Sequence, residues 1–198
     1  MDQGELFMTS DTSILHISIF STVLLISACQ SSSPSRPTPQ VQPEVLYSYP
    51  HRLVVNKYDV IDGDTLNIYD ENNQKTRVRL TGIDAPESNQ SKGIDSLNQL
   101  KNCLNPDHIQ INWATKDRYD RLLAKVISDG KDCNLKQIEA GMAWHYKYFE
   151  KDQPELDRAE YGQAEINAKK NAVGLWSESC PTPPWDWRKN KTSVCTDQ

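Results

Sequence analysis

Three short segments of β-type sequence follow one another with only a few turn residues between them, and this spacing limits how the chain can fold. They span residues 53–61, 64–70 and 75–83, and Asp70-Glu71-Asn72-Asn73 forms the turn between the last two. Strands this close in sequence pair with their neighbours in order. The first part of the folded region is therefore predicted to be a β-meander.

The rest of the chain predicts two more strands and three helices. In order, these are a helix at 92–104 that stops at Asn105-Pro106, strands at 108–114 and 121–128, and helices at 133–140 and 154–172 that are followed by Gly141 and Gly174. Five strands with a helix after the third are typical of a small closed barrel. The predicted fold class is α+β.

Carboxylates lie at the turns of the meander. Asp62 and Asp64 flank a glycine between the first two strands, and Asp84 follows the third strand. A hard divalent cation prefers carboxylate, carbonyl and water oxygens, which Asp64, Asp84 and the backbone carbonyl of Ala85 can supply. No cysteine or histidine has the spacing of a soft-metal site. The pattern predicts a site for a hard cation.

Two arginines and a further carboxylate complete the candidate site. Arg79 lies on the third strand and Arg121 at the start of the fifth. Planar guanidinium groups form paired hydrogen bonds with phosphate oxygens, so both arginines suit a phosphodiester whose negative charge grows during attack. Glu87 follows Asp84 by three residues, behind the stiffening Pro86. We predict that Glu87 is the general base that activates water.

Each of these pieces also has a simpler interpretation. Asp62-Gly63-Asp64 alone is most often a hairpin turn, and Arg79 alone is a solvated strand residue. Arg121 can pair with Asp117 or Asp120. The joint occurrence of all the pieces in one short region favours a site.

With these motifs in view, the chain resembles the thermonuclease, or staphylococcal nuclease-like, family over roughly residues 52–188. Five motifs carry the resemblance in order: Ile61-Asp62-Gly63-Asp64-Thr65; Arg79-Leu80 with Gly82-Ile83-Asp84-Ala85-Pro86-Glu87; Asp117-Arg118-Tyr119-Asp120-Arg121-Leu122-Leu123-Ala124; Gly141-Met142-Ala143-Trp144; and Gly174-Leu175-Trp176 followed by Pro184-Trp185-Asp186-Trp187-Arg188. The resemblance implies a calcium-dependent nuclease on a five-stranded oligonucleotide-binding-type (OB) β-barrel with three helices.

The resemblance also implies a role for each matching residue. Asp64, Asp84 and the Ala85 carbonyl match the positions that hold one Ca²⁺, and Asp62 matches an acid behind them. Arg79 and Arg121 match the positions that contact the phosphate, and Glu87 matches the presumed base. One position departs from the family, because Asp120 replaces a glycine and can form a competing ion pair with Arg121. An exposed ion pair is worth less than about 1 kcal/mol, so we expect an altered rate and retained activity.

Aromatic residues near the basic motif are candidates for stacking on nucleotide bases. Tyr119 is the strongest candidate because it lies two residues from Arg121. Tyr146 and Tyr148 can also stack on bases, whereas Trp144 and Phe149 are expected to pack in the core.

The first 29 residues have the character of an export signal. Residues 14–28 are almost wholly apolar or small and end at Cys29, a run shorter than a membrane-spanning helix. The residues before Cys29 resemble a bacterial lipoprotein box, which implies lipid attachment to Cys29 and anchoring to the cell envelope. The signal lacks its usual positive charges, and secretion without a lipid is the alternative. Polar, proline-bearing residues 30–51 are a predicted disordered spacer, residues 52–188 the nuclease-like domain and residues 189–198 a tail.

Four cysteines remain after Cys29, an even number in a chain with an export signal. Three pairings are possible, and we favour Cys103 with Cys133 and Cys180 with Cys195. The first would join the end of one helix to the start of the next, and the second would close the C-terminal tail. Free buried thiols in a reducing compartment are the alternative.

The composition narrows the class of function. The chain has 27 acidic and 22 basic residues, and its first 29 residues hold three of the acids and none of the bases. The remainder is nearly neutral, which argues against a passive nucleic-acid-binding module. We predict an endonuclease-like hydrolase that cleaves DNA and RNA with calcium and needs no obligate protein partner. The alternatives are a noncatalytic nucleic-acid-binding OB module and a surface lipoprotein with a structural metal site.

Overall fold

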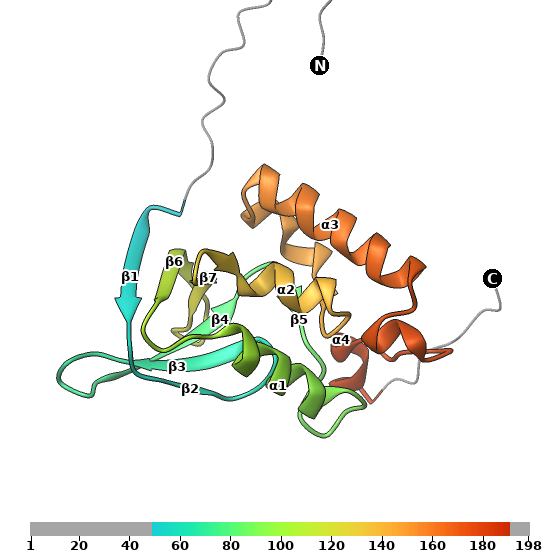
Figure 1. Cartoon of the computed structure of the whole chain (residues 1–198), viewed down its shortest axis with the longest axis horizontal. Helices are drawn as coiled ribbons and strands as arrows, with labels where there is room; N and C mark the ends of the chain where they lie inside the picture. Colours follow the sequence, from blue (N-terminus) through green and yellow to red (C-terminus); the bar gives the residue numbers. More distant parts are fainter. Residues whose placement is uncertain (1–48, 191–198) are drawn as a thin grey trace, which may run out of the picture. The chain divides into compact units, whose positions relative to one another are not determined.

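The structure is a computed structural model that describes residues 49–190 of the 198 (Figure 1). The strands are β1 (His51–Val55), β2 (Tyr58–Val60), β3 (Thr65–Tyr69), β4 (Lys75–Leu80), β5 (Ile83–Asp84), β6 (Ile109–Lys116), β7 (Leu122–Ser128), β8 (Lys131–Asp132) and β9 (Trp144–His145). The α-helices are α1 (Gly93–Cys103), α2 (Cys133–Glu139), α3 (Glu155–Lys170) and α4 (Pro184–Trp187), with 3₁₀ segments η1 (Lys147–Asp152) and η2 (Gly174–Ser177). The fold class is α+β, as predicted.

The main sheet has the strand order β1-β6-β7-β4-β3-β2, with β8 added beside β7. The segment predicted as one strand at 53–61 is interrupted at residues 56 and 57, so that β1 pairs with β6 whereas β2 pairs with β3. β1 and β2 lie at the two ends of this strand order, and only residues 56 and 57 connect them. Together, β1 and β2 form one bent strand. Together with β3, β4, β6 and β7, this bent strand gives the predicted five-stranded OB-type arrangement.

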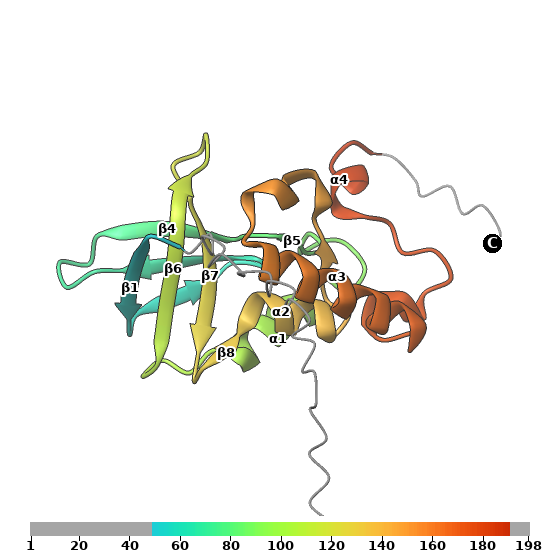
Figure 2. The same ribbon diagram turned by 90° about the horizontal axis from the view of Figure 1, so that it is seen from above.

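The hydrophobic core is formed by side chains of the main sheet and of the helices beside it. Alternate residues of β7 are buried, as expected for a strand with one face on the core. The helices lie beside the strands, with α2 between the barrel and α3 (Figure 2). The most deeply buried core side chains are Leu66, Val78, Leu80, Leu100, Ile109, Ile111, Val126, Ile138 and Tyr161.

The segment predicted as a strand at 75–83 ends early, and this break positions the candidate site. The backbone leaves β4 at Thr81-Gly82, where Gly82 has φ +77° and a Cβ would collide with the Gln153 side chain. Only glycine adopts that conformation at low cost. The chain then pairs β5 with β9 in a separate two-stranded sheet, which puts Asp84 opposite Trp144.

The three predicted helices appear as α1, α2 and α3, each within a few residues of its expected ends. Cys103 at the end of α1 and Cys133 at the start of α2 form a disulfide, as predicted. Their sequence separation of 30 corresponds to a stabilisation of about 3 to 4 kcal/mol in the chain-entropy model. The short helix α4 was not predicted.

Several predictions fall outside the described residues. They concern the export signal at 1–29, most of the spacer at 30–51, most of the tail at 189–198, and Cys195 as the partner of Cys180. Cys180 itself is disulfide-bonded. Among residues 49–190, no helix has the length and apolar character needed to cross a membrane.

Candidate active site

The turn before β3 holds Asp64 in a buried position. Gly63 leaves no room for a side chain, because a Cβ there would lie 2.8 Å from the Cβ of Ala85. One Asp64 oxygen, Oδ2, accepts a hydrogen bond of 2.6 Å from the backbone N–H of Ala85. The other, Oδ1, accepts from the Thr65 hydroxyl at 3.1 Å and pairs with Arg79. The turn therefore fixes the carboxylate against the residue that follows β5.

Arg79 joins the two principal carboxylates. It lies opposite Thr65 in the β3–β4 pairing, and its Nη2 donates to Oδ1 of Asp84 at 2.7 Å while Nη1 pairs with Asp64. Asp84 is fully buried and Asp64 is 5% exposed. Burial lowers the pKa of Arg79 below its ordinary value, and the charge of Asp84 opposes this effect. A single guanidinium thus spans the distance between the two predicted metal ligands.

Asp62 holds the backbone of Asp64 in place. Its carboxylate accepts a hydrogen bond of 3.0 Å from the backbone N–H of Asp64. Burial raises the pKa of the Asp62 carboxyl, although the charges of Arg79 and Arg121 act in the opposite direction. Both arginines therefore lie within electrostatic range of Asp62.

Arg121 enters the site from the start of β7, which runs parallel to β4. Its Nε and Nη2 atoms each lie 2.7 Å from Oδ2 of Asp117. Burial alone would raise the pKa of Asp117, but the hydrogen bonds from Arg121 hold it below its ordinary value. The charge of Arg121 also acts on Arg79. The two arginines predicted to contact phosphate are electrostatic neighbours.

The predicted competition between Asp120 and Arg121 is wrong. The Asp120 carboxylate pairs instead with Lys116, at 2.7 Å, because the backbone turns it toward solvent. Asp120 has φ +62°, in the left-handed region that favours glycine. This conformation accounts for the glycine that the resembling family usually has at this position.

Glu87 lies at the edge of the site with a partner that the sequence did not suggest. Its Oε1 accepts a hydrogen bond of 2.7 Å from Nη1 of Arg188, which follows α4. The same guanidinium contacts both oxygens of Asp84, with Nη1 at 3.2 Å from Oδ1 and Nη2 at 2.6 Å from Oδ2. The structure therefore gathers all five predicted charged residues and adds Arg188 to them.

Comparisons with known proteins identify the family of the chain. The family model described as staphylococcal nuclease homologue matches residues 77–178. The chain belongs to this family.

Three proteins that are similar to this chain are described as nucleases. The chain is 36% identical over 132 residues to an uncharacterized endonuclease of Haemophilus influenzae, covering 67% of this chain and 71% of that protein. It is 35% identical over 133 residues to an uncharacterized endonuclease of Escherichia coli O157:H7, covering 67% and 82%. It is 34% identical over 139 residues to a micrococcal nuclease of Shigella flexneri, covering 66% and 77%. These matches class the chain as a hydrolase that acts on nucleic acids, as predicted.

Carboxylate oxygens are donors that a hard cation prefers, and two carboxylates lie together in this site. Asp64 and Asp84 contact one guanidinium, and the backbone N–H of Ala85 donates to Asp64. Among residues 49–190, no group of three or more acidic, histidine or cysteine side chains is arranged to hold a metal ion. A cation there would be held by two carboxylates, with a carbonyl and water completing its oxygen ligands.

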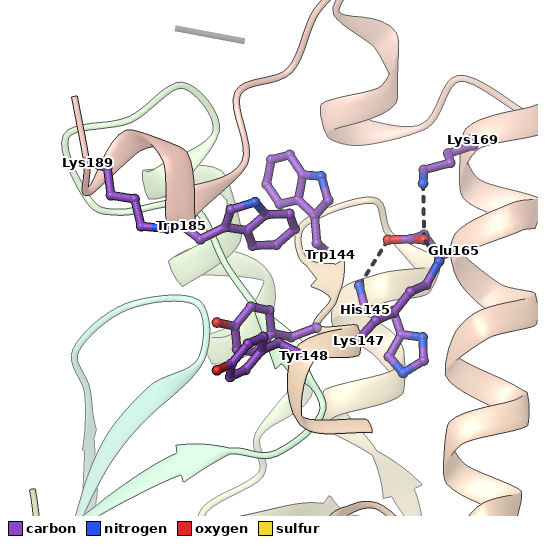
Figure 3. A pocket seen from close by; sticks show the side chains of 9 residues that line it. Trp144, His145, Lys147, Tyr148, Glu165, Lys169, Trp185 and Lys189 are labelled. Carbon is purple, nitrogen blue, oxygen red and sulfur yellow. Dashed lines mark hydrogen bonds and ion pairs between the residues drawn. The ribbon is translucent and has the colours of Figure 1, made fainter. Parts of the chain in front are cut away.

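A pocket of about 630 Å³ is lined in part by β9, the strand that pairs with β5 (Figure 3). Trp144, opposite Asp84 in the β5–β9 pair, contributes to its wall. Burial and the charge of Asp84 raise the pKa of Tyr146, which links the pocket to the acids. Figure 3 shows Trp144, Trp185 and Tyr148 on one side and Glu165 with Lys169 on the other. The lining residues are Trp144, His145, Tyr146, Lys147, Tyr148, Glu165, Lys169, Trp185 and Lys189.

The aromatic predictions have mixed outcomes. Tyr119 is 64% exposed and lies under the guanidinium groups of Arg118 and Arg121, at 4.8 and 5.5 Å from its ring centroid. Trp144 is buried, as expected. Phe149 is not a core residue, because it is 49% exposed, and its ring meets those of Tyr146 and Tyr148 edge to face.

Arg188 and Trp185 belong to the last of the five family motifs, but the sequence predicts no role for either. Their sequence signal was the spacing of Trp185, Trp187 and Arg188 after two prolines. Nothing in that pattern identifies Asp84, 104 residues earlier, as the partner of Arg188.

Proposed function

We propose that the protein is a calcium-dependent endonuclease that hydrolyses phosphodiester bonds in DNA and RNA. The observation that carries the proposal is the bridge formed by Arg79 between two buried carboxylates, with Arg121 in electrostatic range. That combination offers negative groups for a cation and positive groups for a phosphate within one small region.

Arg79 and Arg121 are the phosphate-binding residues in this proposal. A guanidinium carries five N–H donors, and those of Arg121 that do not face Asp117 remain available to phosphate oxygens. Because charge builds on those oxygens during attack, the two arginines stabilise the transition state more than the ground state. Asp117 fixes the direction in which Arg121 points.

Glu87 is the general base in this proposal. Its side chain is 35% exposed, so water reaches it, whereas the buried Asp84 is shielded. Glu87 would take a proton from the attacking water, and that step requires an oxygen free of Arg188. Asp64, Asp84 and the Ala85 carbonyl would hold Ca²⁺, which when bound neutralises phosphate charge and polarises the phosphoryl oxygen.

The aromatic pocket and Tyr119 are the candidate contacts for the rest of the substrate. Tyr146 and Trp185 lie 5.5 Å apart between ring centroids, and the lining lysines supply positive charge. Bases stack on aromatic rings with about 1 to 3 kcal/mol each and little sequence preference. These features support a substrate with unpaired nucleotides near the cleaved bond.

We also propose that the enzyme acts outside the cytoplasm, held to the bacterial envelope by a lipid on Cys29 or secreted. The Cys103–Cys133 disulfide supports this location, because such bonds persist in oxidising compartments.

The proposal is tested by incubating the purified protein with single-stranded DNA or RNA in Ca²⁺ and in chelator. We expect degradation in Ca²⁺ alone, loss of it in Arg121→Ala, and no change in Arg52→Ala, which removes an exposed arginine on β1. Substrate binding without cleavage in the wild type would favour the noncatalytic module. A melting temperature lowered by chelator, with no cleavage, would favour a structural metal site.

A further inference from the structure

The C-terminal arginine occupies the same carboxylates that the proposed mechanism needs. Arg188 is the C-cap of α4, a four-residue helix that begins at Pro184. Its guanidinium forms three hydrogen bonds, two to the buried Asp84 and one to Glu87. Burial alone would lower the pKa of Arg188, but these hydrogen bonds raise it above its ordinary value. The contact is a strong, charge-assisted one.

These contacts leave Asp84 covered by arginines. Its Oδ1 accepts from Arg79 and Arg188, and its Oδ2 accepts from Arg188 at 2.6 Å. A divalent cation such as Ca²⁺ binds carboxylate oxygens at about 2.3 to 2.6 Å. It excludes any other positive group from the lone pairs that it uses. A cation on Asp84 and the guanidinium of Arg188 on Asp84 are therefore competitors.

We propose that Arg188 is an internal counter-cation that closes the carboxylate site, and that a divalent cation binds by displacing it from Asp84 and Glu87. The inference rests on the proposed function, which assigns these acids to the cation and to the water. Arg188 is then a positioning residue that sets cation affinity. Its departure also frees Glu87, so that cation binding and release of the base occur together.

The surroundings of Arg188 allow such a movement. Its side chain is 44% exposed, so it can leave the acids without opening the core. The helix has other attachments, since Trp185 packs near Tyr146 and the Trp187 Nε1 donates to Asn89 at 3.2 Å. Only the arginine side chain needs to move. When Arg188 leaves, the cation replaces it at Oδ2 of Asp84, while Arg79 faces Oδ1, so the buried carboxylate is not left without a positive partner.

The test is the affinity for Ca²⁺ itself, measured by isothermal titration calorimetry without nucleic acid. Three forms of the full chain are compared: wild type, Arg188→Gln, and the control Arg52→Gln, which removes the same charge from β1. If the closed form is about nine-tenths populated, Arg188→Gln should bind Ca²⁺ about tenfold more tightly, because apparent affinity scales with the competent fraction. Arg52→Gln should bind as the wild type does.

Equal or weaker binding by Arg188→Gln would overturn the inference while leaving the cation site intact. Failure of all three proteins to bind Ca²⁺ would overturn the proposed site and the inference together. A second measurement needs no variant: the guanidinium NMR resonances of Arg188 in wild type should shift and exchange faster with water when Ca²⁺ saturates the protein. Unchanged resonances at saturation would contradict displacement.

Discussion

Asp84 and Glu87 lie three residues apart but differ in how the fold holds them. Asp84 is in β5, paired with β9, and its side chain is completely buried between two arginines. Glu87 follows Pro86 outside any strand, and its side chain is 35% exposed with Arg188 as its ion-pair partner. In the proposed mechanism, the buried and paired Asp84 would belong to the fixed charges that meet cation and phosphate, whereas proton transfer would fall to the more exposed Glu87.

The largest effect is expected from a change at Arg79, which lies between the buried carboxylates of the site. Arg79→Ala should reduce kcat by about 10² to 10³, as for the loss of one donor to a developing negative charge. It should also lower the free energy of unfolding by about 3 kcal/mol, because Asp64 loses a buried partner. Arg188 continues to pair with Asp84 and limits the loss. Steady-state kinetics and urea unfolding measure the two effects.

Arg121→Ala is the matched comparison for that experiment. Its guanidinium pairs with Asp117 at a partly exposed position, so an activity loss of similar size should come with less than about 1 kcal/mol of destabilisation. If both variants lost equal stability, the distinction between a buried bridge and a surface-held arginine would not hold.

Glu87→Gln tests the role of the exposed edge of the site. Loss of a general base should lower kcat by about 10² or more, while stability changes little because Glu87 is partly exposed. Cleavage at the wild-type rate would remove Glu87 from the mechanism.

The carboxylates with Arg79, on one side, and Arg188, on the other, also differ in how far the sequence could predict their positions. The carboxylates lie at the turns of one meander and Arg79 lies on its third strand, so local spacing predicted that Asp64, Asp84 and Arg79 converge. The break at Gly82 was missed, because a strand pattern that continues through Ile83 does not reveal that its end pairs with β9. Arg188 was missed because its contacts to Asp84 depend on where the last helix packs.

The sequence does not decide whether Arg121 pairs with Asp117 or with Asp120, for a related reason. Both acids are near in sequence, and only the backbone conformation decides between them. The positive φ of Asp120 directs its carboxylate to Lys116, which leaves Asp117 facing the arginine. A sequence pattern shows the spacing of charges but does not give the sign of a backbone angle.

A smaller effect is expected from Asp117→Asn, which weakens the support of Arg121. The folded-state pKa of Asp117 lies below 3.8, so its contribution to stability is full above the unfolded value and is lost as pH falls through the folded pKa. Thermal melts of the two proteins should differ at neutral pH, and the difference should shrink as pH falls below the unfolded value and vanish below the folded-state pKa. A constant difference down to the lowest pH would show that the ionised carboxylate is not the cause.

The smallest effect is expected from Asp120→Gly. The change relieves a left-handed conformation that costs a non-glycine residue about 1 kcal/mol, but it gives the unfolded chain more freedom and removes the exposed pair with Lys116. These terms nearly cancel, so the free energy of unfolding should change by less than about 0.5 kcal/mol. Because Arg121 keeps its contacts with Asp117, kcat should stay within about twofold, which is less than a 0.5 kcal/mol change in the barrier. Differential scanning calorimetry and kinetics measure these quantities. A large gain in kcat would mean that Asp120 does restrain Arg121 during catalysis, and the phosphate-binding half of the site would then be less rigid than its ion pairs indicate.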